Sequence, residues 1–306
     1  MITVSAESGP SSPSSPLKAV ESKPRGQFRD AVRTLRNRPV ALTGLAIIFA
    51  WMLLALLAPV LPLESRDLPI NLAMKLQPPS REHWFGTDDA GRDVMTRVIW
   101  AARVSVPAGF LVVFAAITIG STIGAIAGYL GGMVDTIIMR ACDGILAFPS
   151  IILAMAIAAL RGQPSLQNAM IAVVIVLWPE YSRLMRGLVL TIRSNEFVTA
   201  AESIGASRSR VLFRHIIPST DAPMVVKATL DVGAAIVLTA GLSFIGLGAV
   251  PPTAEWGAMV SQGSKNGVQF WWYHTFPGLA IVSVVMALNF FGDGLRDALD
   301  PKRRMR

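Results

Sequence analysis

The chain has 306 residues, of which 52% are hydrophobic and 16% are charged, and its mean hydropathy is +0.51. Most of the hydrophobic residues fall into long uncharged runs, which excludes disordered, collagen-like and disulfide-stabilised classes and indicates a membrane protein. The single cysteine and the three scattered histidines cannot form a zinc cluster of the usual spacing, so no metal site is predicted.

The formal net charge of +8 and the isoelectric point near 10.2 would also fit a nucleic-acid-binding protein. A basic protein that crosses a bilayer has a simpler explanation, because lysine and arginine are retained on the cytoplasmic side of the membrane. We therefore expect the lipid bilayer, and no nucleic acid, as a partner.

Six stretches contain no Asp, Glu, Lys or Arg, and each is near or above the ~17 to 25 residues that a membrane-crossing helix needs. They are residues 41–63, 104–134, 144–160, 162–179, 232–254 and 266–292. The second and sixth are longer than one span and are expected to include loop, at Gly131 and Gly132 and at the aromatic residues 271–273. The third is short and is expected to borrow residues 137–139. The sequence thus predicts an all-α polytopic membrane protein with six transmembrane helices.

These runs predict the organisation of the chain. The first run is longer than the ~7 to 15 apolar residues of a signal peptide, and about forty residues precede it in the chain. It is therefore interpreted as a retained transmembrane span. The predicted parts are a disordered and then basic tail (1–39), the first span (40–63), an extracytoplasmic loop (64–103), a five-helix core (104–295) with a cytoplasmic loop at 191–220, and a basic tail (296–306).

Lysine and arginine counts predict the orientation. Twenty of these residues lie in the two terminal tails and in the connections on the same side of the membrane as the tails. The other eight lie in the connections on the opposite side. Both termini are therefore expected in the cytoplasm.

The most informative segment lies between the fourth and fifth runs, on the predicted cytoplasmic side. Ser194 or Asn195 can cap a helix on which four residues fall at i, i+3, i+4 and i+7 of one face. These are Phe197, Ala200, Ala201 and Ile204. Gly205 then stands where a helix would stop in a left-handed conformation, Ser207 can cap a second helix, and Pro218 is expected to end it.

This helix–glycine–helix segment has two interpretations that its periodicity leaves open. The small alanines would let another protein approach closely, and the charged residues Glu196, Glu202, Arg208, Arg210 and Arg214 would lie at the rim. The alternative is an amphipathic segment that lies on the lipid headgroups.

Glycines recur every fourth residue at Gly120, Gly124, Gly128 and Gly132. Small residues at this spacing allow helices to pack closely in lipid, so these four are predicted packing residues. A substrate path is the alternative interpretation. Lys227 and Asp231 are one helical turn apart and are expected to pair. The aromatic residues Trp256, Trp271, Trp272 and Tyr273 are expected to anchor at the membrane interface.

The segment at 194–218 resembles the cytoplasmic signature of binding-protein-dependent ABC importer permeases, which is an E-A-A triplet, a glycine four residues later and a closing Ile-x-Leu-Pro. Here residues 199–201 stand for the triplet, Gly205 for the glycine and Pro218 for the proline. Thr199, His215 and Ile217 depart from the pattern, but the spacing from glycine to proline is kept.

Three further segments resemble the "C" partner of the heterodimeric dipeptide and oligopeptide type of permease. They are HWFGTDDAGRDVMTRVIWAARVS (83–105), LSFIGLGAVPPTAEWGAM (242–259) and FFGDGLRDALDP (290–301). The four segments occur in the family's order, and the resemblance covers residues 33–302.

The resemblance implies a type I importer permease in a bacterial inner membrane. Its implied partners are a homologous second permease, two cytoplasmic ATPase subunits and an extracytoplasmic substrate-binding protein. It also implies that a coupling helix docks on an ATPase, with Glu196, Phe197, Ala200, Ala201, Glu202, Ile204, Gly205 and Pro218 as coupling residues. The implied cargo is a di- or oligopeptide, although similar permeases serve nickel chelates, glutathione, opines and oligosaccharides.

The sequence contains no G-x-x-x-x-G-K-[ST] phosphate loop, so ATP and Mg²⁺ are expected on partner subunits and no cofactor on this chain. It also contains no H-E-x-x-H or G-x-S-x-G motif, so no catalytic residue is predicted. The alternative function is an ion-coupled secondary transporter that works without ATPases. Such a carrier typically has inverted repeats and broken helices, and neither is evident in the sequence.

Overall fold

The computed structural model describes residues 35–61 and 70–299. This part of the chain is built from helices, and its only β contact is one isolated bridge between Thr87 and Asp93. Residues 1–34 of the predicted N-terminal tail, residues 62–69 and the last seven residues of the predicted C-terminal tail lie outside the described residues.

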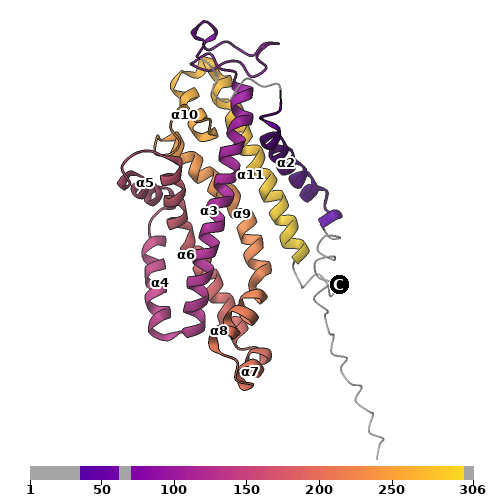
Figure 1. Ribbon diagram of the computed structural model, residues 1–306, viewed down its shortest axis with the longest axis vertical. Helices are drawn as coiled ribbons and strands as arrows, with labels where there is room; N and C mark the ends of the chain where they lie inside the picture. The colour runs from indigo at the N-terminus through magenta and orange to yellow at the C-terminus, as the bar shows by residue number, and fades with distance from the viewer. Residues whose placement is uncertain (1–34, 62–69, 300–306) are drawn as a thin grey trace, which may run out of the picture.

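The four longest helices, α3, α6, α9 and α11, form an elongated bundle. Helix α2 lies alongside α11, and α7 and α8 lie at the opposite end of the bundle from α10 (Figure 1). The helices are α2 (Pro39–Leu57), α3 (Val94–Leu130), α4 (Gly132–Leu146), α5 (Ser150–Leu160), α6 (Leu166–Arg193), α7 (Glu196–Ser203), α8 (Arg208–Val211), α9 (Asp221–Phe244), α10 (Trp256–Lys265) and α11 (Trp271–Leu299). Short turns of 3₁₀ or π helix are η1 (Leu72–Met74), η2 (Leu212–Ile216), η3 (Ile217–Thr220) and η4 (Val268–Phe270).

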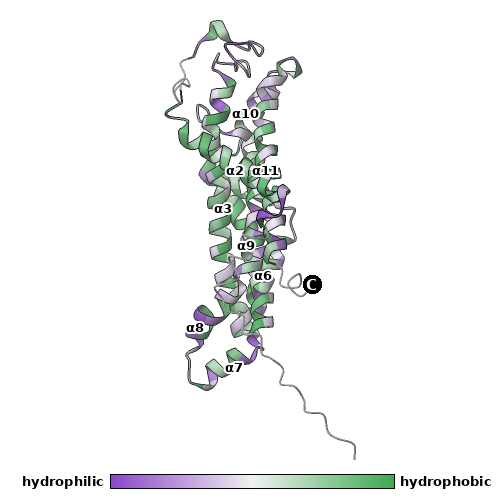
Figure 2. Ribbon diagram, turned by 90° about the vertical axis from the view of Figure 1, so that its right-hand side faces the viewer, coloured by the Kyte–Doolittle hydropathy of each residue, from purple (hydrophilic) through white to green (hydrophobic). Residues whose placement is uncertain are grey.

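Within residues 35–61 and 70–299, four segments are long and apolar enough to cross a membrane: α2, α3, the continuous helical stretch from α8 through α9, and α11 with η4. The pair α4 and α5 adds a fifth if a helix pair bent by 93° counts as one span. α6 is also long, with 28 residues, but Glu180, Arg183 and Arg186 lie within it. Figure 2 shows hydrophobic colour along most of the bundle and hydrophilic colour at its two ends.

Each of these three charges on α6 is matched by an opposite charge on a neighbouring helix. Lys227 Nζ on α9 lies 2.8 Å from Glu180 and 2.9 Å from Asp231, which confirms the expected pair and extends it to a third residue. The two ion pairs to α4 are Arg183–Asp143 and the bidentate Arg186–Asp135. Paired charges are tolerated in a membrane bundle, where isolated ones are not.

Several predicted boundaries are wrong, because capping groups and turns end helices whether or not a charge is nearby. α3 begins at Val94, inside the predicted loop 64–103, since the Asp93 side chain accepts a hydrogen bond from the Thr96 amide at 2.7 Å. α6 continues through Pro179 to Arg193. α9 ends at Phe244, and the rest of the fifth run is the connection to α10.

The third and sixth runs also differ from their predictions. The third is two helices, α4 and α5, that meet at Phe148 and Pro149, because a proline disfavours helix at the residue before it. The aromatic residues 271–273 open helix α11 and are not loop, whereas the interruption expected at Gly131 and Gly132 is confirmed at Gly131 alone, because Gly132 already belongs to α4.

The interface between α3 and α6 is a backbone contact at successive turns. A Cβ atom added at Gly120 or Gly124 would overlap a carbonyl oxygen of α6, and one added at Gly128 would lie 3.0 Å from the Arg186 carbonyl oxygen. Gly132 differs from its prediction: a Cβ there would have no neighbour within 4 Å, because this residue begins α4 with a φ of +57°.

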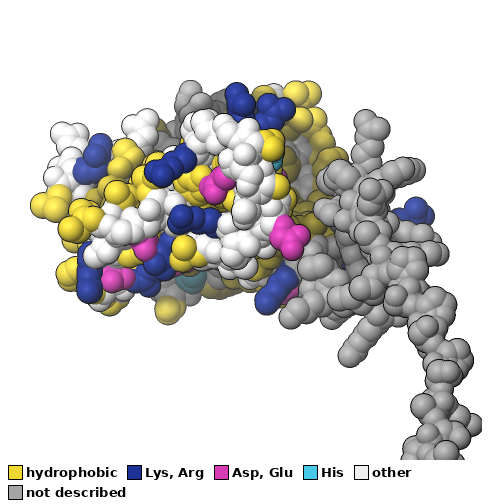
Figure 3. Space-filling model, turned by 90° about the horizontal axis from the view of Figure 1, so that it is seen from below, with side chains coloured by type: hydrophobic (Ala, Val, Ile, Leu, Met, Phe, Trp, Pro, Cys, Tyr) yellow, Lys and Arg dark blue, Asp and Glu magenta, His cyan; other side chains and the backbone are white. Residues whose placement is uncertain are grey.

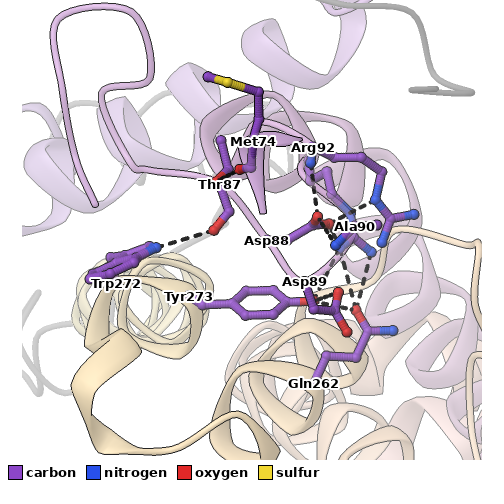
Figure 4. Close-up of polar contacts among 10 residues, drawn as sticks. Met74, Thr87, Asp88, Asp89, Ala90, Arg92, Gln262, Trp272 and Tyr273 are labelled. Carbon is purple, nitrogen blue, oxygen red and sulfur yellow. Dashed lines mark hydrogen bonds and ion pairs between the residues drawn. The ribbon is translucent and has the colours of Figure 1, made fainter. Parts of the chain in front are cut away.

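A buried network closes the α10 end of the bundle (Figure 4). Asp88 is fully buried, and its carboxylate accepts hydrogen bonds from the amides of Ala90 and Arg92 and from the guanidinium groups of Arg92 and Arg97. The Tyr273 hydroxyl lies 3.0 Å from both Asp89 and Gln262, so the loop before α3 is joined to α10 and α11.

The aromatic residues do not behave as one membrane anchor. Trp256, Trp272 and Tyr273 are buried, and only Trp271 is half exposed. The indole of Trp256 donates to the Val98 carbonyl at 3.0 Å. The interface-anchor prediction is therefore wrong for three of the four, because their polar atoms bond inside the fold.

We predict that Gly124→Ala lowers the free energy of unfolding by about 1–3 kcal/mol, because the added methyl group overpacks a backbone contact. Gly144→Ala is the control, since a Cβ at that helical position meets no atom within 4 Å. The control should unfold at the same temperature as the parent or higher. Equal thermal midpoints for both purified variants would contradict the packing role.

We predict that Asp88→Asn lowers the free energy of unfolding by about 3–5 kcal/mol, because it leaves the buried Arg97 guanidinium without a carboxylate. Asp89→Asn is its matched control, since an amide oxygen can still accept the Tyr273 hydrogen bond. Thermal unfolding of the detergent-purified proteins should separate the two. A control variant as unstable as Asp88→Asn would show that the whole loop, and not the buried charge, matters.

Candidate functional site

A short helical module projects from the end of the bundle where α6 ends and α9 begins (Figure 1). It consists of α7, the turn at Gly205, and α8 with its continuation η2. We call residues 194–216 the coupling module. It is the segment from which the sequence predicted a helix, a glycine turn and a second helix.

The turn between the two helices has the predicted left-handed glycine, with a φ of +83° at Gly205. The Gly205 amide donates to the Glu202 carbonyl at 3.0 Å, and the Ala206 amide donates to the Ala201 carbonyl at 3.1 Å. This pair of bonds is a Schellman motif, which satisfies the last carbonyls of a helix and favours glycine. A Cβ at Gly205 would meet nothing within 4 Å, so backbone conformation alone selects glycine here.

The caps of the module match the sequence in part. Ser207 accepts a hydrogen bond from the Arg210 amide at 3.4 Å and begins α8. Asn195 stands at the N-cap of α7, but its side chain makes no capping bond.

The second helix does not end at Pro218, and that prediction is wrong. α8 passes into the π turn η2 and the 3₁₀ turn η3, and η3 runs directly into α9. Pro218 lies at the start of η3. Proline has no amide proton to donate, but little helical hydrogen bonding is lost at this position because the helix changes pitch here. The membrane helix is therefore continuous with the module.

The predicted apolar face of α7 is divided between the interior and the solvent. Val198, which the sequence analysis did not select, is buried at 1% exposure. Phe197 and Ile204 are 44% and 87% exposed, and Ala200 is exposed while Ala201 is half buried. A large apolar side chain near each end of α7 is thus left uncovered by the described residues.

α7 is held to the bundle by a polar contact as well as by Val198. The Tyr129 hydroxyl, near the end of α3, donates to the Glu202 carboxylate at 3.0 Å. The Arg193 guanidinium lies over the Tyr129 ring, 5.6 Å from its centroid. Glu202 was predicted as a rim residue, but Tyr129 was not singled out, because it lies 73 residues away in the sequence.

A cavity of about 340 Å³ opens beside this contact. Its lining residues are Tyr129, Leu130, Arg193, Glu202, Ala206 and Arg208. We call this space the module pocket. Viewed from this end, the molecule displays several lysine and arginine side chains and fewer acidic ones (Figure 3). Among residues 35–61 and 70–299, no group of three or more His, Cys, Asp or Glu side chains could hold a metal ion.

Comparison with known proteins agrees with this arrangement. Residues 120–305 match the family described as "Binding-protein-dependent transport system inner membrane component". Residues 26–79 match the family described as "N-terminal TM domain of oligopeptide transport permease C".

Similar proteins cover nearly the full length. A dipeptide transport system permease protein of Alkalihalophilus pseudofirmus is 47% identical over 277 residues, 90% of each chain. A probable D,D-dipeptide transport system permease protein of Escherichia coli is 45% identical and covers 93% of this chain and 95% of its own. A glutathione transport system permease protein of Pectobacterium atrosepticum is 44% identical over 73% of this chain and 74% of its own.

The relatives are permease subunits of ABC transporters and not enzymes, and the matched family is one of bacterial inner-membrane components. The helical bundle, the apolar spans and the projecting module fit that description. The chain therefore belongs to the family of binding-protein-dependent transport system inner membrane components, as a permease subunit of an ATP-driven importer.

Proposed function

We propose that this chain forms half of the translocation path of a di- or oligopeptide importer. The observation that carries the proposal is the coupling module, in which α7 carries exposed apolar side chains and, after the turn at Gly205, α8 continues through η2 and η3 into α9. The cargo class is supported by the names of three relatives, which refer to dipeptide, D,D-dipeptide and glutathione. All of these are short peptides.

The proposed topology has six spans and both termini in the cytoplasm. The spans are α2, α3, the bent pair α4 and α5, α6, α9 and α11. Pairing of every interior charge of α6 supports its inclusion. In this arrangement residues 1–39 and 296–306 are cytoplasmic tails, 64–93 precede α3 outside the membrane, and 191–220 form the cytoplasmic loop.

The proposed coupling residues are Glu196, Phe197, Ala200, Ala201, Glu202, Ile204, Gly205 and Pro218. Phe197, Ala200 and Ile204 are exposed and available to a groove on an ATPase subunit. Ala201 and Glu202 hold α7 against the bundle, Gly205 forms the turn after α7, and Pro218 lies where the module joins α9. Closure of the ATPases would move α7, and α9 would move with it as a rigid body.

The proposed partners follow from this role. They are a homologous second permease, two ATPase subunits that bind ATP and Mg²⁺, and an extracytoplasmic substrate-binding protein. The chain itself is proposed to bind no cofactor, and its sequence contains no phosphate loop.

The bent pair α4 and α5 favours a second candidate, an ion-coupled secondary transporter, because broken helices are common in such carriers. Asp143, the acidic residue near the bend, forms an ion pair with Arg183 on α6, so its carboxylate already has a partner within this chain. Uptake into liposomes that hold this chain without ATP would favour the secondary transporter.

We predict that Gly205→Ala lowers ATP-dependent peptide uptake about 5- to 30-fold, because a side chain at positive φ costs ~1–2 kcal/mol and tilts α7. Gly246→Ala is the control, since Gly246 has a φ of +91° and open space but lies at the other end of α9. Radiolabelled dipeptide uptake by cells expressing each variant measures the difference. Equal uptake would exclude a coupling role for the Gly205 turn.

We predict that Ile204→Asp lowers the amount of ATPase subunit that co-purifies with this chain at least tenfold, because it places a charge in the apolar contact. Val268→Asp is matched in exposure, at 87% for both side chains, but lies at the far end of the bundle. Quantitative mass spectrometry of the purified complexes should show loss for the first variant alone. Retention of the ATPase by Ile204→Asp would move the docking surface away from α7.

A further inference from the structure

The module pocket carries an unbalanced positive charge. Arg193 and Arg208 line it, and neither forms an ion pair within the described ranges 35–61 and 70–299. Its one carboxylate, Glu202, already accepts a hydrogen bond from Tyr129. Two guanidinium groups against one carboxylate leave a net charge of about +1 in a cavity of about 340 Å³.

The pocket lies at the end of an uncharged helical stretch that is long enough to cross the hydrocarbon core of a bilayer. Residues 104–130 of α3 contain no charged residue and measure roughly 40 Å at 1.5 Å per residue, which exceeds the ~30 Å of a bilayer core. Leu130 ends this run, is 51% exposed and lines the pocket. Leu190, one turn before Arg193 on α6, is also exposed. An apolar surface therefore leads directly to the two arginines.

We propose that the module pocket binds the phosphate of an anionic phospholipid, with acyl chains along Leu130 and Leu190. Guanidinium groups match phosphate geometry and are weakly hydrated, which suits them to this contact. Basic pockets between membrane helices on the cytoplasmic side are suited to anionic headgroups. The cytoplasmic placement rests on the proposed function.

The bound phosphate would bridge Arg193 at the end of α6 and Arg208 at the start of α8, in a pocket whose lining comes from four elements. Leu130 belongs to α3, Arg193 ends α6, Glu202 belongs to α7 and Arg208 begins α8. A lipid held there fixes the orientation of α7 relative to the bundle, and it makes the position of the coupling helix depend on the anionic lipid content of the membrane.

The test measures lipid binding to the full purified chain, without ATPases or binding protein, by native mass spectrometry. Dioleoyl phosphatidylglycerol and dioleoyl phosphatidylcholine are titrated separately, and inorganic phosphate is added as a competitor. We expect saturable binding of phosphatidylglycerol, weaker binding of phosphatidylcholine, and little displacement by inorganic phosphate.

The variants give effects of opposite sign. Arg193→Gln and Arg208→Gln should each weaken phosphatidylglycerol binding about fivefold. Glu202→Gln should strengthen it, because it removes the only negative charge in the pocket, and a misfolded variant would not bind more tightly. Arg214→Gln is the control, since it removes one exposed arginine of the module outside the pocket, and it should change binding less than twofold.

Two results would overturn the proposal. Equal losses for Arg193→Gln, Arg208→Gln and Arg214→Gln would indicate general attraction to a basic surface. Binding of inorganic phosphate with no preference for phosphatidylglycerol would assign the pocket to a free anion. Because the measurement uses the chain alone, neither result bears on its coupling to an ATPase, which the uptake and co-purification experiments test separately.

Discussion

The contact between α3 and α6 is the constraint on which the rest of the structure depends. Gly120 and Gly124 bring the backbones of these helices together, and no side chain larger than hydrogen fits at either residue. In a bilayer, where burying apolar surface gives little drive for association, such van der Waals contact is a main source of helix pairing. Because α3 and α6 end near each other, the same contact places Tyr129 beside Arg193 and Glu202.

Charge pairing decides which helices can join this bundle. α6 brings Glu180, Arg183 and Arg186 into it, and each is neutralised from α9 or α4. These pairs connect α6 to α9 and α4 and restrict the rotation of both, since a rotation of either would leave a charge unmatched. At the α10 end of the bundle, Asp88 and Arg97 also form an ion pair. This pair links the loop before α3 to the ends of α10 and α11.

The coupling module combines firm attachment with an uncovered outer surface. Val198 and Glu202 fix α7 to the bundle and the Schellman turn at Gly205 ends the helix, whereas Phe197 and Ile204 remain exposed. The helical path from α8 into α9 has no loop, so a displacement of the module is transmitted along a membrane helix. A flexible connection would absorb such a displacement, and the changes of pitch in η2 and η3 preserve the connection at Pro218.

Local chemistry was readable from the sequence alone: the apolar runs that require a membrane, the left-handed turn at Gly205, and the Lys227–Asp231 pair one helical turn apart. These depend on neighbouring residues and on the bilayer, which short segments report directly. The predicted helix ends were wrong where a charged residue was taken as the end of a span, because the paired charged residues of α6 lie inside the bundle. Only the tertiary structure decided three contacts: Val198 packs inward from α7, Tyr129 pairs with Glu202, and Arg97 pairs with Asp88. Packing selects which face of a helix is buried, and it brings together residues whose sequence spacing does not relate them.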